Sequence, residues 1–419
     1  MSAVGKFRTA VDLTGSQVLA WSFLGRLPAA MGPIGTLLMV TQQTGSVWRG
    51  SAVTGALALG QAIGGPLVGR AADRRGQRRV GLLAAGVNTA ALLALVAASQ
   101  GGAALGWQLS AAALAGLSIP AVGPLSRSRW LRLAQGRPGP TGAALWLDGL
   151  IDEVSFTGGP AVVGVLATLL APAAGLLLAA ALVGLCATLF ALHPTAAPGA
   201  APTAAQAAAP GAAPGAARHA RATGRLLTAP YGLLLAGMAL LGAVFGSIQV
   251  GVTASTGQLG HPGAAGLVYG LMGGASACSG VAMAALPARF DLPARLRAGT
   301  VLLLAAALLL PPLGHTLGGL ALAVGCVGLA VAPQMITMFG LVERTVPGER
   351  LGEAMAGLVS SITLAQAAGT AAAGWAAATG GPGAPFLVSC AAAAAALLLA
   401  AATATERRYR RTEVMLSAA

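Results

Sequence analysis

The sequence is poor in charged and aromatic residues. Asp, Glu, Lys and Arg make up only 9% of its 419 residues, and Phe, Trp and Tyr only 4%, whereas 56% are hydrophobic. A soluble domain carries charge on about a quarter of its residues, because its surface must stay solvated. This shortage of charge, with a mean hydropathy of +0.77, excludes an ordinary soluble domain and predicts an all-α integral membrane protein.

The spacings that metal, redox and phosphate sites need are also missing. The four cysteines stand singly inside apolar runs, with no CxxC pair and no His/Cys cluster, so they are interpreted as small buried hydrophobic residues. Neither a phosphate-binding loop nor a nucleophile elbow occurs. We therefore expect no metal, no cofactor and no enzymatic activity.

The net charge of +14 raises the question of nucleic-acid binding. The arginines form short clusters between apolar runs and are not interleaved with aromatic residues, which argues against that function. Such clusters are typical of the loops that orient a membrane protein. The high Ala, Gly and Arg content with a single lysine indicates a genome rich in G and C, as in actinobacteria.

Twelve apolar runs are long enough to span a membrane, which takes about 20 residues. They fall into two sets of six, separated by an Ala/Pro/Gly-rich segment that we interpret as a flexible linker. The expected spans are 16–40, 49–70, 80–99, 104–124, 142–168 and 171–192, then 229–253, 264–287, 298–316, 318–341, 353–377 and 384–404. The expected units are an N-terminal half (1–192), the linker (193–227), a C-terminal half (228–405) and a basic tail (406–419).

The basic residues lie almost entirely on one side of this arrangement. Twenty-three of the 25 Lys and Arg residues precede an odd-numbered span or follow the last one. The positive-inside rule therefore predicts that both termini are cytoplasmic. The two exceptions are Arg26, within the first span, and Arg49, at the start of the second. We expect a multi-pass protein of the cell membrane.

The most informative loop joins the second and third spans and reads GRAADRRGQRR, beginning at Gly69. Gly76 permits a tight bend, and Asp73 can accept charge-assisted hydrogen bonds from arginines or helix N-termini. A positive-inside loop with an incidental aspartate is the alternative interpretation. The offsets of Gly69, Asp73, Arg74, Gly76 and Arg78 favour a specific motif.

This loop resembles a signature of the major facilitator superfamily, G-x-x-x-D-R/K-x-G-R/K-R/K, at the same place between helices. Gln77 fills one normally basic position. The helix count, the division into two sixes and the linker extend the resemblance over the whole chain, and it points to actinobacterial efflux members. The resemblance implies a transporter, which we expect to be monomeric, and a loop that acts as a conformational latch between the halves.

The fifth predicted span contains carboxylates. Asp148 and Asp152 lie one helical turn apart on one face, with Glu153 beside them. Carboxylates within a membrane are costly and by default indicate function, although a span that begins later would leave Asp148 among the lipid headgroups. Arg26 lies at a similar depth in the first span and is a candidate partner for Asp152. The pair is either a static brace or a proton-sensitive switch.

Other polar and small residues suggest further roles. Gly159, Pro160 and Gly164 resemble part of a motif that marks the antiporter branch of the same superfamily, and such residues let a neighbouring helix approach closely. The spans of the C-terminal half contain no charge well inside the membrane. Gln249 and Gln334 are candidates for lining a polar cavity, or for bonding between helices.

These patterns predict a secondary transporter that exports a small amphipathic or drug-like molecule in exchange for protons, by alternating access. Asp148, Asp152 and Glu153 are the expected protonatable groups, with Arg26 as counter-ion. An importer of a sugar or other metabolite is the alternative within the same fold. A membrane-embedded scaffold or enzyme without transport is the alternative of another class.

Overall fold

A computed structural model of the chain describes residue 11 and residues 15–133, 138–196, 228–284, 291–346 and 351–417. The side chains of residues 131, 138–146, 153, 284, 351–353, 356 and 403–417 lie outside this description. The proposed role of Glu153, most of the predicted linker and the side chains of the basic tail therefore fall outside the described part of the chain.

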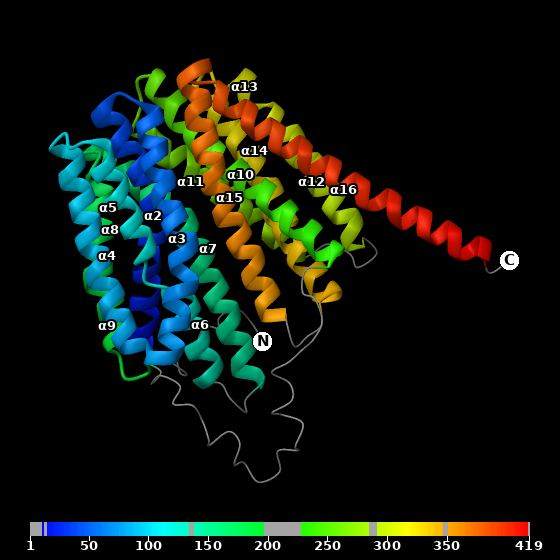
Figure 1. Ribbon diagram of the computed structural model, residues 1–419, viewed down its shortest axis with the longest axis horizontal. Helices are drawn as coiled ribbons and strands as arrows, with labels where there is room; N and C mark the ends of the chain where they lie inside the picture. The colour runs from blue at the N-terminus through cyan, green and yellow to red at the C-terminus, as the bar shows by residue number, and fades with distance from the viewer. Residues whose placement is uncertain are drawn as a thin grey trace, which may run out of the picture.

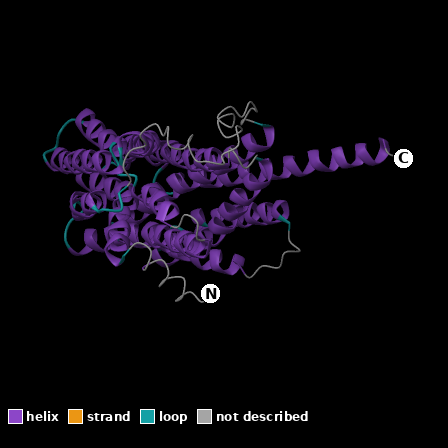
Figure 2. Cartoon of the chain, turned by 90° about the horizontal axis from the view of Figure 1, so that it is seen from below, coloured by secondary structure: helices purple, strands orange, loops and turns teal. Residues whose placement is uncertain are grey.

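Helices joined by short loops make up the described chain, which contains no strand (Figure 2). The N-terminal half comprises α2 (Ser16–Thr44), α3 (Val47–Arg75), α4 (Gln77–Gln100), α5 (Leu105–Leu117), α6 (Val122–Leu133), α7 (Pro138–Leu169), α8 (Ala174–Leu182), a π-helical turn (Val183–Ala187) and α9 (Thr188–Leu192). The C-terminal half comprises α10 (Ala229–Gln258), α11 (Ala264–Ala284), α12 (Leu292–Leu308), α13 (Leu310–Leu313), α14 (Leu317–Thr345), α15 (Leu351–Gly380) and α16 (Ala384–Ser417).

Eleven helical stretches of the described chain are long and apolar enough to cross a membrane. The twelfth long helix is α15, which packs along α10 and α3. The predicted fold, two six-helix bundles, is confirmed. The fourth span differs from its predicted bounds, because it runs from Leu105 to Trp130 and bends between α5 and α6.

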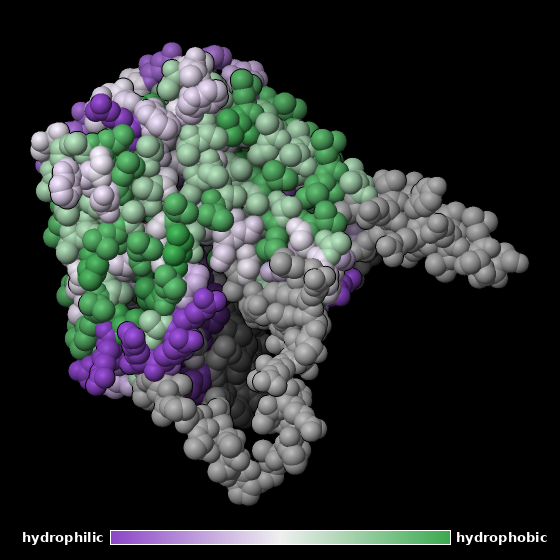
Figure 3. All heavy atoms as spheres, in the orientation of Figure 1, coloured by the Kyte–Doolittle hydropathy of each residue, from purple (hydrophilic) through white to green (hydrophobic). Residues whose placement is uncertain are grey.

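The surface of the bundle suits a lipid environment. Large apolar side chains such as Leu83, Trp107 and Leu398 are about 70% exposed. Figure 3 shows hydrophobic side chains over the flanks and hydrophilic ones gathered toward the ends. In water this much exposed apolar surface would drive aggregation, whereas in a bilayer it faces acyl chains, and the backbone is satisfied within each helix.

Glycine lets the helices approach closely in both halves. A Cβ on Gly60 would lie 2.5 Å from the carbonyl oxygen of Ala113, across the contact between α3 and α5. On Gly242 it would lie 2.1 Å from the carbonyl oxygen of Ile362, across the contact between α10 and α15. Lipid provides no hydrophobic drive for helix association, so this backbone-to-backbone packing is a main source of cohesion.

The two halves meet near one end of the bundle, where α2 ends and α3 begins, which we call the outer end. There α3 packs on α15 and α7 on α11. A Cβ on Gly374 would lie 2.2 Å from that of Ser51, and one on Gly263 would lie 2.1 Å from the Thr168 hydroxyl. Toward the opposite, inner end the helices of the two halves diverge (Figure 1). The outer end is therefore closed in this structure.

Candidate functional site: an ion cluster within the N-terminal half

A break in the fourth span positions the candidate site. The helix α5 ends at Leu117 and α6 begins at Val122, with Pro120 between them. A proline disfavours helical geometry at the residue before it and lacks a donor of its own, so the helix stops and restarts in a new direction.

Neutral contacts then fix α6 against its neighbours. The Ser22 hydroxyl of α2 donates to the Ser126 hydroxyl of α6 at 3.0 Å, and the indole of Trp130 donates to the same oxygen at 2.7 Å. The Trp130 ring packs with Leu19 and Leu147. Through these contacts α6 presents Arg127 to α2 and α7.

Two arginines and two aspartates from three helices form the site. Arg26 of α2 donates to Oδ1 of Asp152 at 2.7 Å and also to Oδ1 of Asp148, both on α7. Arg127 of α6 donates to Oδ2 of Asp148 at 2.9 Å and to Oδ2 of Asp152 at 3.0 Å. Each arginine donates to both carboxylates, and each carboxylate accepts from both arginines. The cluster carries no net charge when all four groups are ionised.

The cluster is enclosed on one side and open on the other. The side chain of Asp148 is fully buried and that of Arg26 is 4% exposed, whereas those of Asp152 and Arg127 are 32% and 49% exposed. A Cβ on Gly123 would lie 3.5 Å from Oδ1 of Asp152, so the backbone of α6 covers this part of the cluster without a side chain. A proton or a ligand group can therefore reach Asp152 and Arg127 but not Asp148.

The structure brings together Arg26, Asp148 and Asp152, as the spacing along the first and fifth spans suggested. It adds Arg127. The predicted end of the fourth span at residue 124 put Arg127 in the following loop, which is wrong, because Arg127 lies on α6 inside that span. The missed signal is the absence of a turn residue in the run SRSRWLRL, where the arginines continue a helix. The fifth span begins at Leu147, so Asp148 lies at its very end, with its side chain buried within the protein. The alternative that places Asp148 at the headgroup level stays a prediction.

A second buried arginine, Arg129, lies on another face of α6. It donates to Oε1 of Gln77 at 2.6 Å and to the carbonyl of Phe190 at 2.8 Å, and its guanidinium lies 3.7 Å from the centroid of the Phe190 ring. No described carboxylate pairs with it. The carbonyls at the C-terminus of α9 supply the negative end of a helix dipole instead. Arg129 was also assigned to a loop, and its 1% exposure corrects that assignment.

Arg129 and Arg132 of α6 also hold the residues that follow α9. Arg132 donates to the carbonyl of Thr195 at 2.6 Å, and the Thr195 hydroxyl lies 3.0 Å from Nδ1 of His193. Partial burial, with a smaller contribution from the charge of Arg129, lowers the pKa of His193 below its usual range. The start of the segment that connects the halves is thus tied to α6.

The loop between α3 and α4 has the turn that its sequence predicted. Gly76 adopts a φ of +93°, which an L-residue rarely adopts, and it ends α3. Asp73, Arg74 and Arg78 are exposed, and no described residue forms an ion pair with Asp73. A Cβ on Gly69 would meet no atom within 4 Å. The latch role of this loop stays a prediction.

Gly159 and Gly164 lie at two different helix contacts. A Cβ on Gly159 would lie 2.9 Å from that of Ala30 on α2, and one on Gly164 would lie 2.7 Å from the amide nitrogen of Leu267 on α11. Pro160 lies inside α7, and its carbonyl oxygen would be 2.3 Å from a Cβ on Gly266. This stretch therefore joins α7 to α2 and to the C-terminal half.

The two candidate cavity glutamines are buried, each 1% exposed. Nε2 of Gln249 and Oε1 of Gln334 have no hydrogen-bond partner among the described residues. A buried amide atom without a hydrogen-bond partner is costly, and neither atom is accessible to solvent in this structure. Cavity lining stays a proposal for both residues.

Comparison with known proteins identifies the fold. The sequence matches no protein-family model and no curated protein. Among solved structures, the nucleoside transporter NupG superposes with a TM-score of 0.68 at 16% identity, over 92% of this chain and 97% of the other. A bacterial homologue of the iron transporter ferroportin, in an inward-facing state, gives 0.67 at 16% over 92% and 97%.

A third similar structure is the human organic anion transporter MFSD10 (TETRAN), with a TM-score of 0.59 at 20% identity over 92% of this chain and 99% of the other. The likeness extends over nearly the whole length of each chain, so it concerns the complete architecture rather than one bundle. The chain is a multi-pass membrane protein with the major facilitator fold.

Proposed function

We propose that this protein is a secondary active transporter of the cell membrane that exchanges protons for a small amphipathic or drug-like molecule by alternating access. The observation that carries the proposal is the cluster of Arg26, Arg127, Asp148 and Asp152, buried on one side and accessible on the other. Two carboxylates inside a membrane span are retained only at considerable cost, which favours a functional role over a structural one.

Within the cluster, Asp148 and Asp152 have different expected roles. Asp148 is enclosed and contacts both arginines, so it is their fixed partner. Asp152 is the accessible proton acceptor. A proton on Asp152 leaves one unit of positive charge on the cluster, and Arg127, half exposed on α6, is the arm that is released. Glu153 next to it is a further candidate acceptor.

The arrangement of the halves gives this event a mechanical consequence. The helix α7 carries both aspartates and also packs on α11 of the other half. A change in how α6 and α7 are joined is therefore transmitted to a contact that must change during alternating access. Asp73, which has no described ion-pair partner while the inner ends are apart, fits a latch that engages when they close.

Export is favoured over import by the glycine and proline pattern of α7, which resembles that of antiporters. The same fold also serves importers, so the direction needs a measurement. Inverted membrane vesicles with an imposed pH gradient, tested with a panel of lipophilic cations and neutral drugs, report both direction and coupling. Exchange predicts proton release from the vesicles upon addition of a transported compound, and symport predicts none in this orientation.

The decisive variant is Asp152→Asn. We expect it to lose proton-coupled flux while counterflow exchange of substrate, which needs no net proton movement, continues. Asp291→Asn is the matched control, because Asp291 caps α12 in the other half by accepting from the Ala294 amide at 3.0 Å, and asparagine caps equally well. Unchanged pH dependence in Asp152→Asn and in Glu153→Gln would remove the proton-coupling role from this site.

A further inference from the structure

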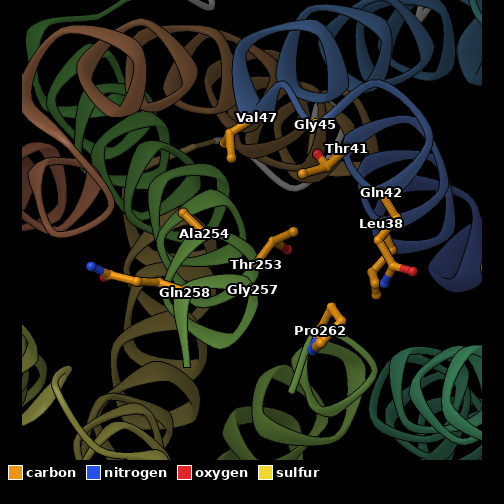
Figure 4. Close-up of a pocket in the computed structure, with 10 residues that line it drawn as sticks. All are labelled: Leu38, Thr41, Gln42, Gly45, Val47, Thr253, Ala254, Gly257, Gln258 and Pro262. Carbon is orange, nitrogen blue, oxygen red and sulfur yellow. The ribbon is translucent and has the colours of Figure 1, made fainter. Parts of the chain in front are cut away.

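The two ends of the bundle differ in the charge that they present. Between the halves at the outer end lies a cavity of about 350 Å³, the outer cavity, whose lining has no charged side chain. Its Gln258 points away from it (Figure 4), and the Thr253 hydroxyl donates to the Gln249 carbonyl at 2.9 Å. This lining offers nothing to an ionic group. At the inner end, in contrast, two arginines of α6 lie against the residues that follow α9.

These two arginines, Arg129 and Arg132, both bind Thr195. Arg132 donates to its carbonyl at 2.6 Å, and Arg129 donates to its hydroxyl at 3.4 Å. Two positive charges are thus held at one residue, and no described carboxylate pairs with either of them. The carbonyl end of α9 offsets only about half a charge.

The neighbouring segments cannot supply the missing negative charge. The stretches that flank these residues in the sequence, 134–147 and 194–228, contain no Asp and no Glu. Positive charges that are partly removed from water are costly unless a counter-charge lies close. A bound anion would therefore offset a charge that the adjoining chain leaves uncompensated.

Donors that can reach such an anion surround Thr195. Arg132, His193 and Thr195 are half-buried, whereas Arg129 is enclosed behind them and acts through its charge alone. We call these four residues the inner basic site. Nδ1 of His193 accepts from the Thr195 amide at 3.3 Å, which leaves the ring hydrogen on Nε2, and no described residue bonds to Nε2. Arg132 uses one guanidinium nitrogen on Thr195 and keeps the others.

The inner basic site lies at the depth of lipid headgroups. The fourth apolar span ends at Trp130 and the sixth at Leu192. Arg132 and His193 follow within two residues, where a bilayer changes from acyl chains to headgroups. Basic side chains between helices at this level recognise anionic headgroups.

An apolar stripe leads from the site along α8, the π-helical turn and α9. Its members, Leu177, Leu185 and Leu192, are 44%, 59% and 39% exposed. Their spacings of eight and seven residues keep them on one face, because the π-helical turn takes up one extra residue. The stripe is about 20 Å long, enough to cross one leaflet of the hydrocarbon core, about 15 Å thick. Figure 3 shows the same order on the visible flank of the N-terminal half, where hydrophobic side chains end in a hydrophilic rim.

We propose that the inner basic site binds the headgroup phosphate of an anionic phospholipid, with one acyl chain along the leucine stripe of α8 and α9. Arg132 and Nε2 of His193 donate to the phosphate oxygens, and the enclosed Arg129 adds its charge. This lipid is separate from the transported molecule, and its binding does not depend on proton coupling. Because Arg132 and Arg127 both lie on α6, the lipid steadies the helix that carries Arg127.

The test measures binding to the purified full-length protein in detergent by native mass spectrometry and by the rise in Tm. The probes are dioleoyl phosphatidylglycerol, which is anionic, dioleoyl phosphatidylcholine, which has the same chains but no net charge, and glycerol 3-phosphate, which has no chains. We expect phosphatidylglycerol to bind best. Equal binding of the two lipids would overturn the recognition of charge, and equal binding of glycerol 3-phosphate would show that the occupant is a free anion.

Variants locate the site. Arg132→Gln should weaken phosphatidylglycerol binding about fivefold, the effect of one arginine near an anionic surface, and His193→Ala, which leaves α6 intact, should also weaken it. Arg344→Gln is the control, because Arg344 is an exposed arginine in the last turn of α14 in the other half.

Leu185→Asn interrupts the stripe and should weaken binding of the lipid but not of glycerol 3-phosphate. Each rise in Tm is compared with that of the same variant without lipid, since Arg132→Gln also loses its bond to Thr195. Parent-like lipid affinity in both Arg132→Gln and His193→Ala would overturn the proposal. Asp152→Asn should bind the lipid like the parent protein, so failure here is separate from failure of proton coupling.

Discussion

The two halves share a helical plan but are held together by different forces. All four ion pairs between described residues lie in the N-terminal half, within a single cluster on α2, α6 and α7. Contacts within the C-terminal half include the Ser247 and Ser389 hydroxyls 2.7 Å apart and the Tyr231 hydroxyl donating to the Ala354 carbonyl at 3.0 Å. Glycine-mediated backbone contact provides the rest.

The difference matters because charge and close packing respond to the environment in opposite ways. One proton added to a neutral cluster of four ions leaves a net charge, so under the proposed function the geometry of the cluster depends on pH. A contact made by glycine backbone against a neighbouring helix has no titratable group, so neither pH nor membrane potential changes it. Under the proposed function, the N-terminal half is the half that senses the proton gradient, and it moves against the C-terminal half.

Removing Arg26 tests the charged half most severely. In Arg26→Leu two aspartates are left with one arginine, and breaking a buried ion network in this way typically costs about 3–5 kcal/mol. Thermal unfolding in detergent should show a large fall in Tm. Arg49→Leu removes an exposed arginine and should change little. The double variant Arg26→Leu/Asp148→Leu should recover part of the loss; a single variant as stable as the parent would mean that the cluster does not stabilise the fold.

Gln77 offers a second test within the charged half. Its carbonyl oxygen accepts from buried Arg129, and hydrogen bonds to charged groups are worth about 1.5–3 kcal/mol. We expect Gln77→Leu to lose stability of that order in chemical or thermal unfolding. The same substitution at the exposed Gln43 is the control. Equal effects at both positions would show that the contact with Arg129 contributes nothing.

The neutral half is tested by adding one methyl group. In Gly242→Ala the new Cβ would lie 2.1 Å from a backbone oxygen of Ile362, which cannot rotate away, so α10 and α15 must separate. Overpacking of this kind costs about 1–3 kcal/mol. Gly232→Ala on the same helix meets no atom within 4 Å, and there the added methyl should be neutral or stabilising by roughly 0.5–1 kcal/mol. Similar Tm values for both variants would contradict the close contact between α10 and α15 at Gly242.

The sequence predicted the helices well because hydrophobic length and arginine placement are local signals. It also predicted the depth of Arg26 and Asp152, since helical rise is fixed. It missed Arg127 because the four-residue break at Pro120, not the apolar run itself, decides where α6 points. The outer cavity was not predictable, because it depends on how the end of α10 meets the end of α2. That contact is formed by residues more than 200 positions apart.

The smallest expected effect concerns His193, at the end of the charged half. Its pKa is lowered by partial burial and by the nearby Arg129, so the folded state holds the imidazole neutral while the unfolded chain protonates near pH 6.5. As the pH falls below 6.5 toward the lowered folded pKa, the unfolded state binds more protons and stability declines. Replacing His193 with Asn should flatten the pH dependence of Tm in this window. The control is His261→Asn, in an exposed loop of the C-terminal half, which should leave the pH dependence of Tm as it is. Identical profiles for both variants would show that the anchoring of the Thr195 segment to α6 is insensitive to pH.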